Sequence, residues 1–109
     1  MANYKTIEEN RLALHQILCD VLGSRNVYFQ PPEDVKIVFP AIIYELEGID
    51  TKYADDTHKY KRDLRYKITL ASSNPEHDIV DRLLDLRYSR LESISHYDNL
   101  HNYYINIYF

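Results

Sequence analysis

The sequence predicts an α+β fold: an antiparallel β-sheet of about four or five strands with two helices packed on one face. Two segments place apolar residues at helical spacing, and several others alternate apolar and polar residues as half-buried strands do. Their order is helix, strands, helix, strands, which favours helices gathered on one side of a sheet. With 109 residues and 45% hydrophobic content, residues 1–109 are expected to form a single domain.

The first helix is predicted between Thr6 and Gly23. Thr6 and Glu9 have the spacing of a capping box, and glycine commonly ends a helix. Between them, one helical stripe is apolar. Its members are Ile7, Leu14, Ile17, Leu18, Val21 and Leu22.

Residues 24–34 are expected to form an extended connection, with a short strand at its start as an open alternative. Only Val27, Tyr28 and Phe29 are apolar there, and two prolines follow them. Strand-like sequence begins at residue 35, and Pro40 marks a bend, an edge or a strand start because it has no amide hydrogen for a ladder. Residues 41–47 continue the strand into Gly48.

The clearest strand covers residues 60–71, in which apolar and polar side chains alternate from Leu64 to Leu70. The alternation indicates one buried and one solvated face. Residues 49–59 are polar, and we expect them to form a connection longer than a hairpin requires. Long loops of this kind often carry function, so this segment is a candidate contact region.

A second helix is predicted after Ser73 or Asn74 as the cap, with Pro75 in its first turn. Its inner face comprises Ile79, Val80, Leu83 and Leu84. Two more strands are expected at residues 90–97 and 102–109, joined by a turn at Asp98 and Asn99. In the last strand, Tyr103, Ile105, Ile107 and Phe109 alternate with Asn102, Tyr104, Asn106 and Tyr108.

Composition excludes several classes of ligand. The chain has 13 basic and 17 acidic residues, a formal net charge of −4, and so lacks the positive field that binding to phosphate backbones requires. No apolar run approaches the roughly 20 residues of a membrane span, and residues 1–9 are too polar for a secretory signal, so we expect a cytoplasmic protein without membrane contact. Cys19 is the single cysteine, which excludes an internal disulfide and a cysteine-based zinc site.

No catalytic pattern is present. Asp50, Asp55 and Asp56 offer oxygen ligands for a hard cation, but the spacing of a calcium-binding loop is missing. His96 and His101 flank one predicted turn and are candidates for a transition-metal site without a third ligand. The sequence also lacks the HExxH and GxSxG motifs and any glycine-rich phosphate loop. We expect no catalytic residue, no bound metal and no cofactor.

Tyrosine provides most of the aromatic area, with 11 tyrosines and no tryptophan. Tyrosine buries its ring at a contact while its hydroxyl stays hydrogen-bonded, which suits protein interfaces. Tyr104 and Tyr108 lie on the strand face opposite Ile105 and Ile107, so they either form a contact surface or lie under a second small layer. The charged row Lys61, Asp63, Arg65 and Lys67 is either a solvated face or a set of ion-pair partners for a neighbouring subunit.

Five stretches, taken in order, resemble tail terminator or tail completion (head–tail joining) proteins of long-tailed bacteriophages. They are VYFQPP at 27–32, FPAIIY at 39–44, IDTKYAD at 49–55, NPEHDIVD at 74–81 and DNL at 98–100 with the aromatic tail that follows. The resemblance covers nearly the whole chain. It rests on the order and joint presence of these stretches, none of which is a catalytic signature.

The resemblance implies a structural virion protein that forms a ring, typically a hexamer, at the head-proximal end of the tail tube. Such a ring ends tube polymerisation and provides the surface for head attachment. The implied partners are further copies of the chain, the tail tube protein and the head–tail connector protein, and DNA only passes through the channel. Assembly takes place in the host cytoplasm. Candidate subunit-contact residues are Asp50, Lys52, Tyr53, Asp55, Asp56, Tyr104 and Tyr108.

Two other functions stay open at this point. One is a head-completion or connector subunit of the neck, and the other is a small adaptor that binds a partner by strand addition along the last strand. A divalent metal retained after purification would point to an enzyme. If the acidic residues Asp55 and Asp56 line the channel, neutralising both should alter DNA passage, and unchanged infectivity would remove that hypothesis.

Overall fold

The computed structural model describes residues 6–31, 34–54, 59–86 and 88–109, with side chains for all of these except 51–54 and 59–62. Seven elements follow in order: α1 (Ile7–Leu22), β1 (Val27–Phe29), β2 (Ala41–Ala54), β3 (Lys59–Ser72), α2 (His77–Leu84), β4 (Ser89–Tyr97) and β5 (Leu100–Tyr108). The strands form one five-stranded sheet in the order β1-β2-β3-β5-β4. The predicted α+β fold is confirmed.

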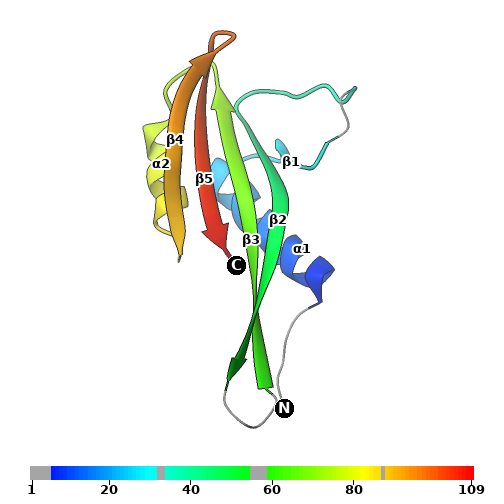
Figure 1. Ribbon diagram of the computed structural model, residues 1–109. Helices are drawn as coiled ribbons and strands as arrows, with labels where there is room; N and C mark the ends of the chain where they lie inside the picture. Colours follow the sequence, from blue (N-terminus) through cyan, green and yellow to red (C-terminus); the bar gives the residue numbers. More distant parts are fainter. Residues whose placement is uncertain (1–5, 32–33, 55–58, 87) are drawn as a thin grey trace.

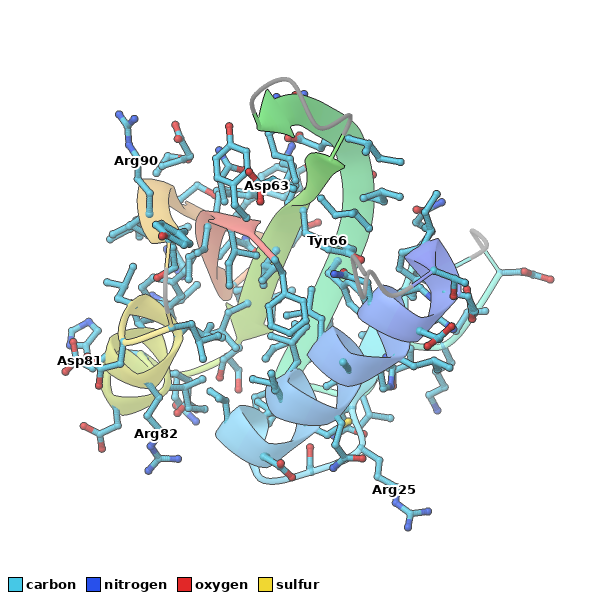
Figure 2. The ribbon with its side chains drawn as sticks, turned by 90° about the horizontal axis from the view of Figure 1, so that it is seen from below. Arg25, Asp63, Tyr66, Asp81, Arg82 and Arg90 are labelled. Atoms are coloured by element: carbon cyan, nitrogen blue, oxygen red, sulfur yellow. The ribbon has the colours of Figure 1, made fainter. Side chains whose placement is uncertain are left out.

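Both helices cover the same face of the sheet, as Figure 2 shows from below. β1 pairs with β2 in parallel, whereas the other three pairings are antiparallel. The sheet is therefore mixed, and the prediction of a wholly antiparallel sheet is wrong at this edge. The parallel pairing arises because the chain crosses from Phe29 back to Ala41 before it enters β2, so that both strands run in the same direction.

The predicted ends of α1 are confirmed. The Thr6 hydroxyl accepts a hydrogen bond from the Glu9 amide at 3.1 Å and donates one to the Glu9 carboxylate at 3.0 Å. Gly23 adopts a left-handed conformation with φ 78°, and its amide donates to the carbonyl of Cys19. Glycine takes this conformation without the steric cost that a Cβ would bring. Leu14 and Leu18 are the fully buried residues of the helix.

The start of α2 differs from the prediction. The helix begins at His77 after Glu76, and no side chain caps its first amides, so neither Ser73 nor Asn74 is the cap. Instead, the buried Ser72 organises the turn: its hydroxyl donates to the Glu76 carboxylate at 3.0 Å and accepts from the Asn74 amide at 3.2 Å. Ile79, Val80 and Leu83 are buried as predicted, but Leu84 is 37% exposed.

The predicted strand at residues 35–38 is not formed. β2 begins at Ala41, directly after a cis peptide bond between Phe39 and Pro40. Pro40 itself lies in a bend, so the bend alternative is correct. The segment before it pairs with no strand among the described residues, and Val35 and Val38 are exposed.

The long loop predicted at residues 49–59 is wrong for most of its length. β2 and β3 continue as a ladder as far as the pair Ala54↔Lys59. Polar alternation misled the prediction because a two-stranded ribbon exposes both faces, so it needs no apolar side. The segment also contains Ile49, Thr51 and Tyr53, residue types that favour extended backbone. Asp55 and Asp56 lie outside the described residues.

The core lies between the helices and three strands. Cross-strand neighbours on the helix-covered face form the rows Ile42–Leu70–Tyr103, Tyr44–Ile68–Ile105 and Leu46–Tyr66–Ile107. Most of these side chains are fully buried, and they pack with the inner faces of α1 and α2 in one cluster. The predicted alternation of β3 and β5 is thus confirmed.

Candidate functional site

The sheet face opposite the helices carries a mixed polar and aromatic surface. We call it the open face, and its central members are Glu45, Glu47, Arg65, Lys67, Thr69, Tyr104, Asn106 and Tyr108. These positions alternate with the core positions on β2, β3 and β5, so they point away from both helices. No described helix or strand covers this face, which removes the alternative of a second small layer within the described part of the chain.

Arg65 lies at the centre of a charged cluster at one end of the open face. Its Nε is 3.8 Å from Glu47 Oε2, and its Nη1 is 3.8 Å from Asp50 Oδ2. A hydrogen bond to the Tyr108 hydroxyl, together with these two carboxylates, raises the pKa of the guanidinium. The cluster brings together Asp50 and Tyr108, two of the predicted contact residues.

The Arg65 cluster depends on Gly48. A β-bulge between Leu46 and Gly48 places two residues of β2 opposite Arg65, and the guanidinium lies over Gly48. A Cβ at Gly48 would be 2.7 Å from an Arg65 nitrogen, so a larger residue would displace the side chain. The glycine therefore lets the guanidinium approach the backbone between the two carboxylates.

Tyr104 lies in the middle of the open face. The Lys67 ammonium is 5.9 Å from its ring centroid, and the Ser95 hydroxyl donates to its hydroxyl at 3.3 Å. The ring borders a shallow depression that Glu47, Lys67, Glu92, Ser93 and Asn106 also line. Tyr104 and Tyr108 thus lie on one accessible surface, as predicted for contact residues.

β2 and β3 extend well past the rest of the sheet (Figure 1). β5 accompanies β3 only as far as Tyr108↔Arg65, and the Phe109 amide then donates to the Leu64 carbonyl. Beyond that point six pairs, from Ile49↔Leu64 to Ala54↔Lys59, form a two-stranded ribbon with no third strand among the described residues. We call residues 49–54 and 59–64 the arm. At about 3.3 Å per residue it projects roughly 20 Å, in a molecule measuring 53 × 25 × 22 Å.

Lys52 and Tyr53 belong to this arm. The backbone places them opposite Lys61 and Tyr60, and their side chains are not among those described. The structure therefore brings four predicted contact residues to one end of the molecule: Asp50, Lys52 and Tyr53 on β2, and Tyr108 at the base of the arm.

The sheet has two unlike open edges. β4 is the outermost strand at one side, and its Ile94 and Tyr97 are 59% and 72% exposed. At the other side β1 covers only Ile42 to Tyr44, and the Gln30 side chain accepts from the Leu46 amide at 3.2 Å. Past Leu46, no strand in the described part of the chain borders the outer edge of β2.

β5 lies inside the sheet, paired with β3 on one side and with β4 on the other. Strand addition along the last strand, which the sequence suggested for an adaptor, is therefore excluded because both edges of that strand are occupied. Among the described strands, edges without a strand partner are found on β4 and on β2 past Leu46.

A polar network, which sequence analysis missed, fastens α1 to the sheet. The Tyr44 hydroxyl lies 2.7 Å from His15 Nδ1 and 3.3 Å from an Arg11 nitrogen, and Arg11 also pairs with Glu8. Nearby, the Tyr66 hydroxyl donates to Asn10 Oδ1 at 2.7 Å. Figure 2 shows Tyr66 pointing from the sheet toward α1.

Burial controls the titration of these groups. It raises the pKa of Tyr44, and together with the neighbouring Tyr44 it raises the pKa of Tyr66 to about 12. Burial, assisted by Arg11, lowers the pKa of His15. Tyr44 and Tyr66 are almost closed to solvent, so they hold the fold together rather than contact a ligand. The sequence signal was their place among the inward-facing residues of their strands.

The histidines that flank the β4–β5 turn are brought together. The His96 and His101 rings stack with centroids 4.6 Å apart. Within the described residues, no three histidine, cysteine or carboxylate side chains gather as a metal site would require.

Neither described helix has the length and apolar run needed to cross a membrane.

The chain matches no protein-family model. No curated protein matches it either.

Proposed function

We propose that this chain is a tail terminator of a long-tailed bacteriophage, a structural subunit that forms a closed ring at the head-proximal end of the tail tube. The ring would stop tube polymerisation and offer a surface to the head–tail connector. The sequence resemblance described above suggests this role, and the features of the fold that favour assembly into a ring support it.

The arm is the observation that carries the proposal. A two-stranded ribbon alone is marginally stable in water, because it buries little apolar surface and leaves both outer edges unpaired. Six paired positions of this kind project from the sheet. Such a structure is expected to be held by a neighbouring subunit, so its stability depends on assembly.

The open face and the two sheet edges add to this argument. A closed ring needs two different surfaces on each subunit that fit each other, because every contact is head-to-tail. The chain supplies two different surfaces: the edge of β4 at one side of the sheet, and the arm that continues β2 and β3. Its formal charge of −4 also suits a channel through which DNA slides without binding.

The decisive experiment is electron microscopy of particles from the phage that encodes this chain, with an early stop codon in its reading frame. Overlong tails that are not attached to DNA-filled heads are expected. Tails of normal length beside heads that leak DNA would instead assign the chain to the neck as a head-completion or connector subunit. Intact infectious particles would reject both functions.

The free edge of β4 gives one reason to keep the adaptor as a second candidate. An unpaired strand edge with exposed Ile94 and Tyr97 is a surface to which an extended peptide can add. A purified protein that stays monomeric and binds one host peptide along β4, combined with intact particles in the stop-codon phage, would favour this function over the ring.

A further inference from the structure

We infer that the arm of one copy is held by the β4 edge of the next copy, so that the outer edge of β2 adds to β4 and the sheet continues from subunit to subunit. This inference rests on the proposed ring and specifies which surfaces close it. The partner at both edges is a second copy of this chain.

The strand directions fit this arrangement. β2 to β3, β3 to β5 and β5 to β4 are three successive antiparallel steps, so β2 and β4 run in opposite directions within one subunit. Residues 93–97 of β4 lie level with the start of β2, whereas the arm lies beyond the other end of the sheet. A ring in which the strands are strongly inclined to the axis brings the arm beside β4 of the next copy, and neighbouring subunits keep the same strand direction. β4 of one copy then meets β2 of the next as an antiparallel pair, which is the more stable kind.

The lengths also match. β4 has nine residues, and the uncovered outer edge of β2 runs from Glu47 to the strand end at Ala54. A β-bulge between Leu91 and Ser93 interrupts β4, so the longest regular stretch for pairing is residues 93–97. This stretch and the six-pair arm are of similar length, and on the outer side of each, no described strand pairs with the backbone.

The side chains of the helix-covered face agree with such a continued sheet. Ile94 pairs with Tyr103 and Ile49 pairs with Leu64, so both isoleucines point to the helix-covered side, where each is exposed in one copy. An antiparallel register that sets Ile49 beside Ile94 also sets Asp50 beside the small Ser93 on the opposite face. Contact would therefore join exposed apolar residues on the helix-covered face.

Disulfide cross-linking between copies tests the inference. Cys19 is the only native cysteine, so Cys19→Ser gives a background in which new thiols react specifically. Asp50→Cys is combined in turn with Ser93→Cys, Ser95→Cys and Tyr97→Cys, because the register between copies is the unknown and a disulfide forms only when the two Cα atoms lie within about 7 Å. The assembled protein at the tail tips is oxidised and examined on non-reducing gels.

At least one of these pairs is expected to give a ladder of covalent oligomers, while each single-cysteine variant gives at most a dimer. The matched control joins Asp50→Cys to Glu8→Cys, since Glu8 is exposed on α1, on the helix-covered side. A ladder from Asp50→Cys with Tyr104→Cys, and none from the β4 pairs, would overturn the inference, because the arm would then lie on the neighbour's open face.

A second variant tests the same contact without thiols. In a two-residue hairpin the pair next to the turn, here Tyr97↔Leu100, exchanges both hydrogen bonds. The amide of the next residue, His96, therefore points outward from β4. His96→Pro removes this outward donor and leaves the β4–β5 ladder intact. The variant is expected to fold, by circular dichroism, and to give the overlong tails of the stop-codon phage. Normal tails from His96→Pro would count against edge pairing. If cross-links form but the stop-codon phage is intact, the contact between copies is supported and the tail-terminator function is rejected. If no β4 pair cross-links but the stop-codon phage has overlong tails, the function is supported and the contact is rejected.

Discussion

Two tyrosine hydroxyls determine the position of α1 on the sheet. Each lies at the end of a ring that is buried among apolar side chains, and each finds its partner on the helix: His15 and Arg11 for Tyr44, and Asn10 for Tyr66. Buried polar groups without partners cost free energy, so these contacts set the position of the helix as well as stabilising it.

Removing the Tyr66 hydroxyl should measure this contribution. Tyr66→Phe is expected to lower the free energy of unfolding by about 1 kcal/mol, because Asn10 loses a hydrogen-bond donor while the ring stays buried. Urea denaturation checks the value. Tyr97→Phe, in a side chain that is 72% exposed, is the matched control and should change stability by less than about 0.5 kcal/mol. Equal losses from both variants would contradict the assignment.

The raised pKa of Tyr66 also predicts a response to alkaline pH. The folded state favours the neutral phenol, with a pKa of about 12 against an ordinary value near 10. The stabilisation is complete below the ordinary value and is lost as the pH rises from there through about 12. Unfolding free energies measured at pH 9 and 11 should converge for the native chain and Tyr66→Phe as the pH increases.

His15 should make the protein sensitive to acid. Its pKa is lowered in the folded state by burial and by the nearby Arg11, so the unfolded chain binds the proton more readily. The contribution of His15 to the free energy of unfolding is therefore constant above the ordinary pKa of about 6.5, and it falls as the pH decreases below that value. In urea titrations, the free energy of unfolding of the native chain should be lower at pH 5.5 than at pH 7.5. In His15→Gln this difference between the two pH values should be smaller. An unchanged difference would rule out this residue as its source.

At the scale of elements, the β4–β5 hairpin depends on a tight turn with positive φ at both of its residues. Asp98 and Asn99 both have positive φ, at 53° and 61°, which is the conformation of a tight two-residue hairpin turn. Asparagine and aspartate accept it more easily than other residues with a Cβ. The sequence predicted this turn from the same two residues.

Substitutions at Asn99 test the turn. Asn99→Val should lower the free energy of unfolding by about 1–2 kcal/mol, since a β-branched side chain collides with the backbone at positive φ. Asn99→Gly should leave stability unchanged or raise it slightly, because glycine is the preferred residue at this position of the turn. Thermal unfolding of the two variants gives the comparison, and a stable Asn99→Val variant would show that the turn adopts another conformation.

Sequence reasoning succeeded where burial on one side imposes a period. α1, β3 and β5 each present one apolar face, so spacing alone located them, and Thr6 and Gly23 marked the ends of the first helix. The sequence of the arm had no such period, because polar and apolar residues are mixed from residue 49 to residue 63. The parallel position of β1 depends on a return of the chain through residues 30–40, and no local pattern encodes that path.

The contact residues were only partly predictable for the same reason. Tyr104 and Tyr108 could be placed on the open face because the alternation of β5 is strict. Asp50 was chosen as a loop residue, and its actual setting, in a strand beside Arg65, follows from the pairing of β2 with β3. The network beneath α1 joins residues far apart in the sequence, so it became visible only in the fold.

For the whole molecule, the arm predicts a difference between free and assembled protein. In a monomer, residues 49–54 and 59–64 should exchange their amide hydrogens quickly, whereas the core rows of β3 and β5 exchange slowly. If the protein forms the proposed ring, protection of the arm in the assembled form should increase by about tenfold or more, because the amides gain partners. Hydrogen-exchange mass spectrometry of the two forms measures this change. Equal protection of the arm in both forms would show that it is stable without a neighbour.

The bulge at Glu47 and Gly48 makes the direction of β2 independent of the face on which its residues lie. Leu46 and Ile49 both point to the helix-covered side, although an uninterrupted strand would place residues three apart on opposite faces. Deleting Glu47 would restore regular alternation, and the residues before and after the bulge would stay on the faces that they occupy now. The deletion would also remove the extra twist that a bulge gives a strand. Removal of one codon would thus change the direction of the arm and cost the open face a single side chain, the Glu47 carboxylate beside Arg65. This gives evolution, or an engineer, a simple means to adjust the curvature of an assembly built from this subunit.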